Sequence, residues 1–128
     1  MKIHQFDPVI YPRNIYVVKG EKIGPSIIES FRTEDDEQLC LDGSDGCRAG
    51  VWAVRYLDGK HEPLGVLVWL RCRIDVSVIA HESVHAANQI FEDCGVNYNK
   101  QNDEHFAHLV GFIAKCLWQV HTGKFNDD

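Results

Sequence analysis

The sequence predicts a single domain of the α+β class, with a β-rich first half followed by a helical second half. The chain of 128 residues is long enough for one hydrophobic core and too short for two. Up to Cys72 the apolar residues occur in short β-branched runs, whereas from Val76 onwards they recur with the spacing of a helix. Because the chain has no internal repeat, low-complexity segment or linker, we expect residues 1–128 to form one domain.

The first half contains four predicted strands, which are indicated by short runs of apolar and β-branched residues. Asp58-Gly59, between the last two runs, is a turn signal that predicts an antiparallel hairpin with a loop of several residues. Residues 33–50 are predicted as a loop, in which residues 42–46 lack the full spacing of a calcium loop and are interpreted as a solvated turn. The four predicted strands are residues 10–18, 26–32, 51–57 and 65–72.

A first helix is predicted from about Val76 to Cys94. Asp75 or Ser77 can cap its start, and Gly95 stands where such a helix would end. One face of this helix is apolar and the other is polar. The polar face carries His81, His85 and Asn88.

A second helix is predicted to follow the polar loop 96–102 and to run to about Val120. Asn102 or Asp103 is expected to cap its start. Its apolar stripe and its polar side are separate, as in a helix that packs on a core. The stripe consists of Phe106, Leu109, Val110, Ile113, Leu117 and Val120, whereas Glu104, His108, Gly111 and Lys115 fall on a different side.

The run His81-Glu82-Ser83-Val84-His85 is an H-E-x-x-H motif within the first predicted helix. Positions i and i+4 share one helix face, so His81 and His85 can direct two imidazole nitrogens at one point. This geometry suits two of the three protein ligands of a tetrahedral catalytic Zn²⁺. Glu82, one position round the helix, can act as general base on a zinc-bound water.

Glu104 is the candidate for the third ligand, because a short connection lets the second helix return antiparallel to the first. We expect this return to bring its first turn near the histidine face. His108, one turn further along, is an alternative ligand or a hydrogen-bond partner of one. His105 points elsewhere on the helix, and Asp103 is interpreted as a cap.

The motif and the Glu104 that follows it resemble the gluzincin group of zinc metallopeptidases, the thermolysin-like zincins. The run from Asp75 to Ala87 is similar to the active-site helix of that group over its whole length. The resemblance implies a zincin-like fold, in which a small, mostly antiparallel sheet packs on the H-E-x-x-H helix and on a glutamate helix. It also implies Zn²⁺ as cofactor, held by His81, His85 and Glu104.

In the same group the edge strand of the sheet binds the peptide substrate. Residues 49–53 stand in the matching place, which makes Val51, Trp52 and Ala53 the expected substrate-binding residues. Larger members also have a helical subdomain that supplies an oxyanion-stabilising side chain, and this chain resembles a minimal version without it. Tyr98, in the loop between the helices, is the nearest candidate for that donor.

His108 stands where the group often has an aspartate that orients a zinc-bound histidine. This departure from the family pattern weakens the carry-over of the aspartate's role, and His108 is expected as a hydrogen-bond partner of a ligand only from its place on the helix. Cys47, just before the expected substrate strand, could approach the zinc as an inhibitory thiolate, although an inert cysteine is the favoured interpretation.

Composition limits the partners and the compartment. The net charge of −6 argues against nucleic-acid binding, and against a DNA-associated zincin with three histidine ligands. The chain has no long apolar run for a membrane span and no signal peptide, and its odd number of cysteines includes no C-x-x-C pair. We therefore expect a cytoplasmic protein with reduced thiols. The cysteines are Cys40, Cys47, Cys72, Cys94 and Cys116.

The sequence thus predicts a zinc-dependent metallopeptidase that hydrolyses peptide bonds in a peptide or protein substrate, with Glu82 as general base. The alternative is a zinc-binding regulatory or protein-interaction module of the same fold, with little or no turnover.

Overall fold

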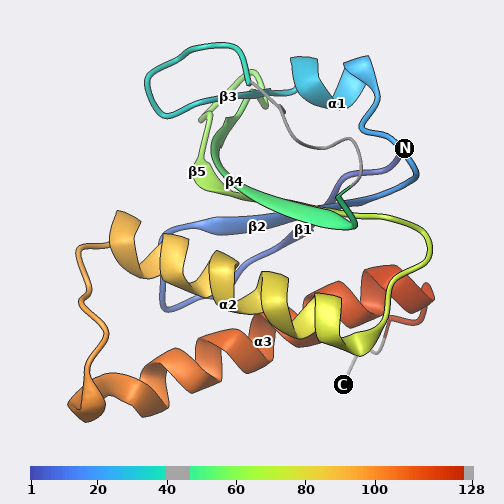
Figure 1. The fold of residues 1–128 in the computed structure, drawn as a ribbon. Helices are drawn as coiled ribbons and strands as arrows, with labels where there is room; N and C mark the ends of the chain where they lie inside the picture. The colour runs from blue at the N-terminus through green and yellow to red at the C-terminus, as the bar shows by residue number, and fades with distance from the viewer. Residues whose placement is uncertain (40–46, 126–128) are drawn as a thin grey trace.

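The structure is a computed structural model that describes residues 1–39 and 47–125. The solvated turn expected at residues 42–46 and the thiol of Cys40 lie outside the described residues. Within these residues the chain is α+β, as the sequence predicts, and is built around a five-stranded mixed sheet. Helices α2 and α3 cover one face of the sheet and the short helix α1 lies on the other (Figure 1).

The strands lie side by side in the order β1-β2-β5-β4-β3. Strands β2 and β5 pair in parallel, whereas the other three pairings are antiparallel. The expectation of a mostly antiparallel sheet is therefore correct except at its centre. The strands are β1 (His4–Phe6), β2 (Asn14–Lys19), β3 (Phe31–Arg32), β4 (Ala49–Tyr56) and β5 (Leu64–Leu70).

Strands β4 and β5 form the predicted hairpin, with Ala49 opposite Leu70 and Arg55 opposite Leu64. At its closed end Asp58 Oδ1 accepts hydrogen bonds from the backbone N–H groups of Lys60 and Glu62. Both N–H groups thus share one carboxylate oxygen, which holds the loop between β4 and β5 in a turn, as in other turns that begin with Asp.

The strand predicted over residues 26–32 is wrong for most of its length. Residues Pro25–Glu29 form α1, and only Phe31–Arg32 are extended. Pro25 occupies the start of α1, where its fixed φ favours a helix and its missing N–H costs nothing. Ile27 and Phe31 are both buried and lie four positions apart, so the short apolar run is compatible with a helical turn.

The strand predicted over residues 10–18 begins only at Asn14, and β1 was not predicted. Pro12 lacks the N–H that a paired strand would need, which delays the start of β2. Strand β1 has three residues, too few for a clear alternating pattern, and it is stabilised by pairing with Ile15 to Val17 of β2.

Helices α2 (Val76–Asp93) and α3 (Asp103–Thr122) confirm the two predicted helices. Asp75 caps α2 by accepting hydrogen bonds from the backbone N–H groups of Ser77 and Val78, at 3.1 and 3.2 Å. A single 3₁₀ turn, η1 (Lys100–Asn102), leads into α3. The side chain of Asn102 does not cap α3; it accepts a hydrogen bond from the backbone N–H of Asn99 at 2.8 Å.

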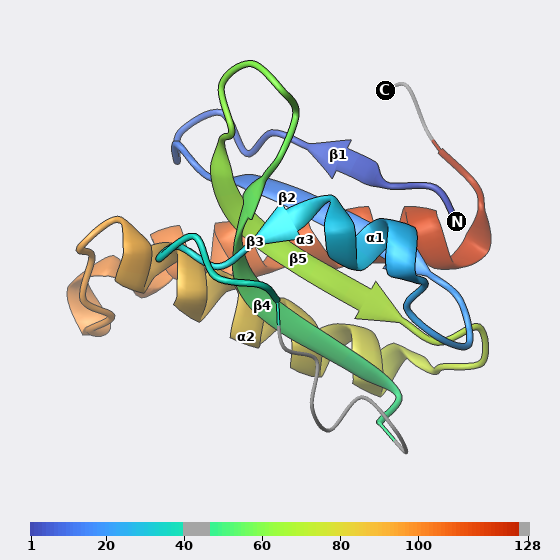
Figure 2. The same cartoon turned by 90° about the horizontal axis from the view of Figure 1, so that it is seen from above.

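The larger core lies between the sheet and the two long helices. Strands β2 and β5 contribute alternate side chains to it, and α2 and α3 contribute their apolar stripes. This packing fixes α2 under the sheet beside β4, a position that is visible from above (Figure 2). The fully buried members of this core include Ile15, Val17, Val66, Val68, Leu70, Ala86, Ala87, Ile90, Ile113 and Leu117.

Candidate metal centre

His81 and His85 stand on the face of α2 that points away from the core, and both side chains are exposed. The opposite face of the helix is anchored by Ala86 and Ala87, which are fully buried. The two imidazoles lie on consecutive turns, with ring centroids 4.6 Å apart and Nε2 atoms 3.0 Å apart. At that separation one ring nitrogen donates a hydrogen bond to the other, the direction depending on the tautomers.

This separation matches what a shared metal ion needs. Two nitrogen ligands about 2.0–2.1 Å from a tetrahedral Zn²⁺ are about 3.3 Å apart. The distance between the two nitrogens is therefore within a few tenths of an ångström of the distance that a shared zinc ion requires. The donor set of two neutral imidazoles is also one that zinc accepts, so the pair fits two of three protein ligands.

Glu82 lies between the two histidines in sequence but turns toward the sheet, so that it is only 9% exposed. Burial raises the pKa of the Glu82 carboxyl, while the neighbouring His81 and His85 act in the opposite direction. A carboxylate with a raised pKa is a stronger base than one in open water. The site therefore combines two imidazole nitrogens at a distance that suits a shared metal ion with a partly desolvated carboxyl.

An open cleft of about 420 Å³ joins this site to the start of β4. Its wall on α2 includes His81 and Glu82, and the facing wall is the chain that enters β4. The lining residues are Cys47, Arg48, Ala49, Ser77, Val78, His81 and Glu82.

Strand β4 has an open edge beside this cleft. On its outer side it pairs with β3 at Arg55 and Tyr56, and the described residues place no strand against residues 49–54. The expected substrate-binding residues Val51, Trp52 and Ala53 lie on this stretch, and each is half-buried. An unpaired strand edge can bind an extended peptide by backbone hydrogen bonds.

The structure does not bring Glu104 to the histidines. Glu104 is in the first turn of α3, and its side chain is 81% exposed. Helix α2 continues for about two turns beyond His85 before it ends at Asp93. The two helices are antiparallel but diverge toward the loop that connects them, so the first turn of α3 lies away from the motif (Figure 1).

His108 is also on this diverging part of α3, with a side chain that is 77% exposed. Its Nε2 lies 3.2 Å from Oε1 of Glu104. Among the described residues no three histidine, cysteine, aspartate or glutamate side chains are placed to hold one metal ion. The expectation that a short loop would set Glu104 opposite the histidine face is thus not met in this structure, and its role as a ligand stays a prediction.

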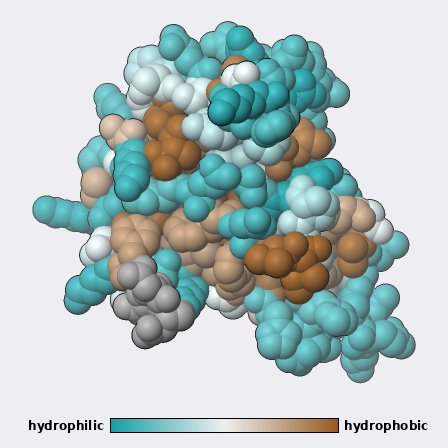
Figure 3. Space-filling view, turned by 180° about the vertical axis from the view of Figure 1, so that it is seen from behind, coloured by the Kyte–Doolittle hydropathy of each residue, from teal (hydrophilic) through white to brown (hydrophobic). Residues whose placement is uncertain are grey.

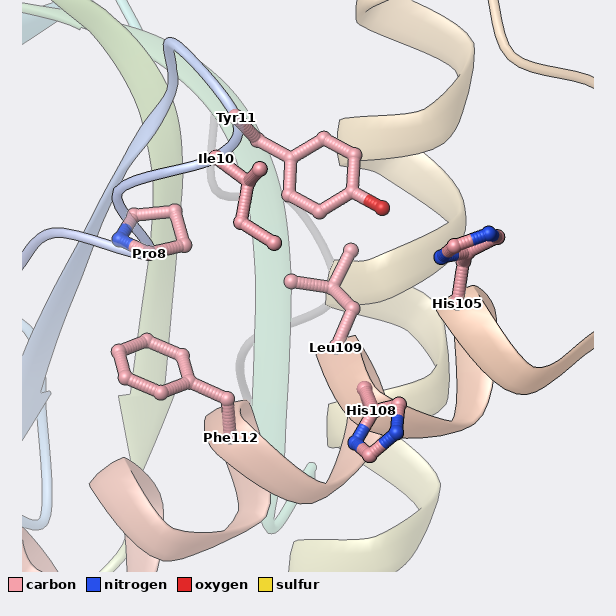
Figure 4. A pocket seen from close by; sticks show the side chains of 7 residues that line it. All are labelled: Pro8, Ile10, Tyr11, His105, His108, Leu109 and Phe112. Carbon is pink, nitrogen blue, oxygen red and sulfur yellow. The ribbon is translucent and has the colours of Figure 1, made fainter.

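Tyr98 and His105 lie outside the cleft. The ring of Tyr98 packs edge-on against Phe106 at 4.9 Å, and the side chain is 58% exposed. This contact gives Tyr98 a packing function, whereas its proposed role as a donor stays a prediction. His105 and His108 border a different pocket of about 220 Å³, which is otherwise lined by Pro8, Ile10, Tyr11, Leu109 and Phe112 (Figure 4).

Hydrophobic surface is also exposed elsewhere, in separate patches on the face opposite to that of Figure 1 (Figure 3). Exposed large apolar side chains include Val9, Ile10, Phe112 and Trp118. Ile10 and Phe112 border the pocket of Figure 4, whereas single exposed apolar side chains are common on protein surfaces and need no functional explanation.

Sequence reasoning missed Arg48, Ser77 and Val78 as cleft residues. Ser77 and Val78 lie about one turn before His81, so the helical period could have placed them beside it. Arg48 had no such signal, because its position depends on how β4 approaches α2.

Comparison of the chain with known protein families, curated proteins and solved structures finds no match. None of the helices in residues 1–39 and 47–125 is both long and apolar enough to cross a membrane.

Proposed function

We propose that this protein is a zinc-dependent peptidase with a zincin-like fold, which hydrolyses peptide bonds in an extended peptide or protein segment. The observation that carries the proposal is the combination of His81 and buried Glu82 in one cleft, with the ring of His85 next to that of His81 and with an edge of β4 that the described residues leave unpaired. Each part has a separate chemical use: binding the metal, accepting a proton and binding the substrate backbone. The cytoplasm, where thiols stay reduced, remains the proposed compartment.

Zinc, when bound by His81 and His85, would supply a Lewis acid that acidifies water and polarises the scissile carbonyl. Glu82 would accept a proton from the attacking water as the water oxygen forms its bond to the carbonyl carbon. Glu82 would then pass that proton to the nitrogen of the breaking C–N bond, so that the amine leaves neutral. The raised pKa of Glu82 suits it to both transfers.

The substrate would be held as an additional strand along β4. Successive residues of a strand direct their backbone groups to opposite edges, so alternate residues among Val51, Trp52 and Ala53 would bind the peptide backbone, without regard to the peptide's side chains. Val51 and Trp52 also pack against opposite cores of the sheet, which fixes the strand that makes these contacts. A rigid strand reduces the entropy lost when the peptide binds.

Glu104 is proposed as the third ligand, with His108 as its hydrogen-bond partner. Binding by Glu104 requires the first turns of α3 to move toward α2. Glu104, His105 and His108 are all exposed, whereas Phe106 packs on Phe91 and Leu109 is buried, so the movement would have to rearrange these core contacts. The contact between Glu104 Oε1 and His108 Nε2 already sets the carboxylate beside a group that could orient it.

The alternative function is a zinc-binding regulatory or protein-interaction module with little or no turnover. The separation of Glu104 from the two histidines favours it, because a site with two protein ligands binds metal more weakly than one with three. A partner segment would then occupy the same β4 edge without being cleaved.

One experiment separates the two functions. Purified protein is loaded with zinc and incubated with a denatured protein substrate, in parallel with the Glu82→Gln variant. Cleavage by the parent and not by the variant supports the peptidase. If neither cleaves while both retain zinc and bind the substrate, the interaction module is the correct function.

A further inference from the structure

The cleft that contains His81 and Glu82 ends at a basic residue. Arg48 precedes β4, and its carbonyl accepts a hydrogen bond from the backbone N–H of Arg71 at 3.0 Å, which extends the sheet by one pair. Its positive charge acts on the carboxylate of Asp75 at the start of α2. Arg48 is thus fixed by its backbone to the sheet, while its guanidinium is within electrostatic reach of the helix beneath.

Among the described residues that line this cleft, Arg48 carries the one permanent positive charge and Glu82 the one carboxylate. In the part of the chain that the structure describes, the Arg48 side chain makes no hydrogen bond or salt bridge. The neighbouring Ala49 and Val78 are small or apolar, whereas the carboxylate of Asp75, within electrostatic reach, offsets part of the charge and also accepts hydrogen bonds from Ser77 and Val78. A guanidinium in this position presents several N–H donors in a planar fork that matches a carboxylate.

The other end of β4 and α2 is acidic. Burial and then the nearby carboxylate of Asp93, at the end of α2, raise the pKa of the Glu34 carboxyl, and the backbone carbonyl of Glu34 accepts a hydrogen bond from Arg55 of β4 at 3.1 Å. Asp35, Asp36 and Glu37 follow in the same turn. Asp93 is about 16 Å along the helix from Glu82, the length of about five residues of extended peptide. A peptide lying along β4 therefore meets at one end a cluster of carboxylates that Arg13 and Arg55 offset only in part, and at the other end Arg48 beside the single carboxylate of Asp75.

This difference in charge sets the direction of the peptide. The amino-terminal part, with its ammonium group, is favoured at the acidic end, and carboxylates are repelled there. A carboxylate is favoured at the end that contains Arg48. The residues C-terminal to the scissile bond, which leave with the amine, then lie against Arg48.

Resting on the proposed peptidase function, we infer that Arg48 is a specificity-determining residue that selects substrates with a carboxylate just C-terminal to the scissile bond. The carboxylate belongs either to an acidic side chain or to the end of the substrate chain, because both offer the same two oxygens to a guanidinium.

The test uses zinc-loaded full-length protein and a set of peptides of one sequence. The residue after the scissile bond is Glu, Gln or Lys, and a further pair of peptides places the chain end there as a carboxylate or as an amide. We expect Arg48→Ala to lower kcat/KM for the Glu peptide by about 10- to 100-fold, the value of a charge-assisted hydrogen bond, with less than about 3-fold change for Gln. A preference for the free carboxylate over the amide would identify the chain end as the source.

Reversing the charge at residue 48 should raise kcat/KM for one peptide as well as lower it for another. Arg48→Glu should make Lys the preferred residue, an outcome that a merely misfolded variant cannot produce. Arg73→Glu is the matched control, because Arg73 is exposed near α2 and does not line the cleft; it should leave the order of the peptides unchanged. Equal kcat/KM for the Glu, Gln and Lys peptides in the parent, or an equal shift in the Arg73 variant, would overturn the inference.

A binding measurement separates this inference from the peptidase proposal. Fluorescence anisotropy with the Glu82→Gln variant measures peptide affinity without turnover. Charge-selective binding that is lost in Arg48→Ala, with no cleavage by the parent, would retain Arg48 as the selecting residue and reject the peptidase. Cleavage by the parent with no charge preference in kcat/KM or affinity would retain the peptidase proposal and reject Arg48 as the selecting residue.

Discussion

The Nε2 atoms of His81 and His85 lie 3.0 Å apart on consecutive turns of α2. This contact is possible because a spacing of four residues aligns the two side chains and the buried face of the helix holds it against the sheet. Two imidazole nitrogens at this distance are either hydrogen-bonded to each other or ready to share a metal ion. The difference between these two states can be measured directly.

Zinc content is the first prediction. The parent protein should retain about one Zn²⁺ per chain after gel filtration, as measured by elemental analysis. His81→Ala and His85→Ala should each lose the metal, because either change leaves a single imidazole on α2. His105→Ala, which changes a histidine outside the cleft, is the control and should retain it. Absence of any transition metal from the reconstituted parent would reject the metal centre.

Substitution of Glu82 separates the base from the ligands. Glu82→Gln keeps the size and the hydrogen-bonding capacity of the side chain but cannot accept a proton. Zinc content should be unchanged, while kcat for peptide hydrolysis should fall by at least about 100-fold. The paired measurement is elemental analysis with single-peptide kinetics on the same preparation. A variant as active as the parent would show that Glu82 is not the base.

The third ligand can be identified by three alanine variants of α3. If the first turn of α3 closes on the metal, Glu104→Ala should weaken zinc binding far more than His108→Ala, for which a loss of about 10- to 100-fold is expected. His105→Ala should have the smallest effect. Competition with a chromogenic chelator gives the three affinities.

Two outcomes would contradict this order. Unchanged zinc affinity in Glu104→Ala would mean that the separation of Glu104 from the histidines persists in the metal-bound protein. A larger loss in His108→Ala than in Glu104→Ala would assign the third position to an imidazole and remove the resemblance to gluzincins.

The cap of α2 predicts a pH-dependent stability. Hydrogen bonds from Ser77 and from the backbone N–H of Val78 hold the pKa of the Asp75 carboxyl below its ordinary range. A carboxyl whose pKa is lowered by folding stabilises the protein above its unfolded pKa, and this contribution is lost as the pH falls through the folded pKa. Asp75→Ala should therefore lower Tm at about pH 7 and have a much smaller effect at about pH 3.

Thermal unfolding followed by circular dichroism measures this difference. Asp103→Ala is a useful comparison, because Asp103 stands in the first turn of α3 and no side-chain hydrogen bond to it is present in residues 1–39 and 47–125. Its effect should be smaller than that of Asp75→Ala. A Tm difference for Asp75→Ala that is equal at the two pH values would show that the ionised carboxylate is not the stabilising group.

The sequence by itself determined the features that depend on neighbouring residues. The i, i+4 spacing of His81 and His85, the cap by Asp75 and the turn at Asp58-Gly59 are local, so helical period and hydrogen-bond chemistry predict them. The α+β class and the bounds of α2 were predicted for the same reason.

Tertiary structure alone decided where distant segments meet. The parallel pairing of β2 with β5, the position of Arg48 in the cleft and the divergence of α3 from α2 join residues that are far apart in the chain. Tertiary packing also decided that residues 25–29 form a helix. Their apolar residues fit a strand or a helical turn equally well, and the burial of Ile27 in one core with Phe31 favours the helix. These arrangements depend on which apolar surfaces can be buried against one another, and the free energy of that burial cannot be inferred from neighbouring residues in the sequence.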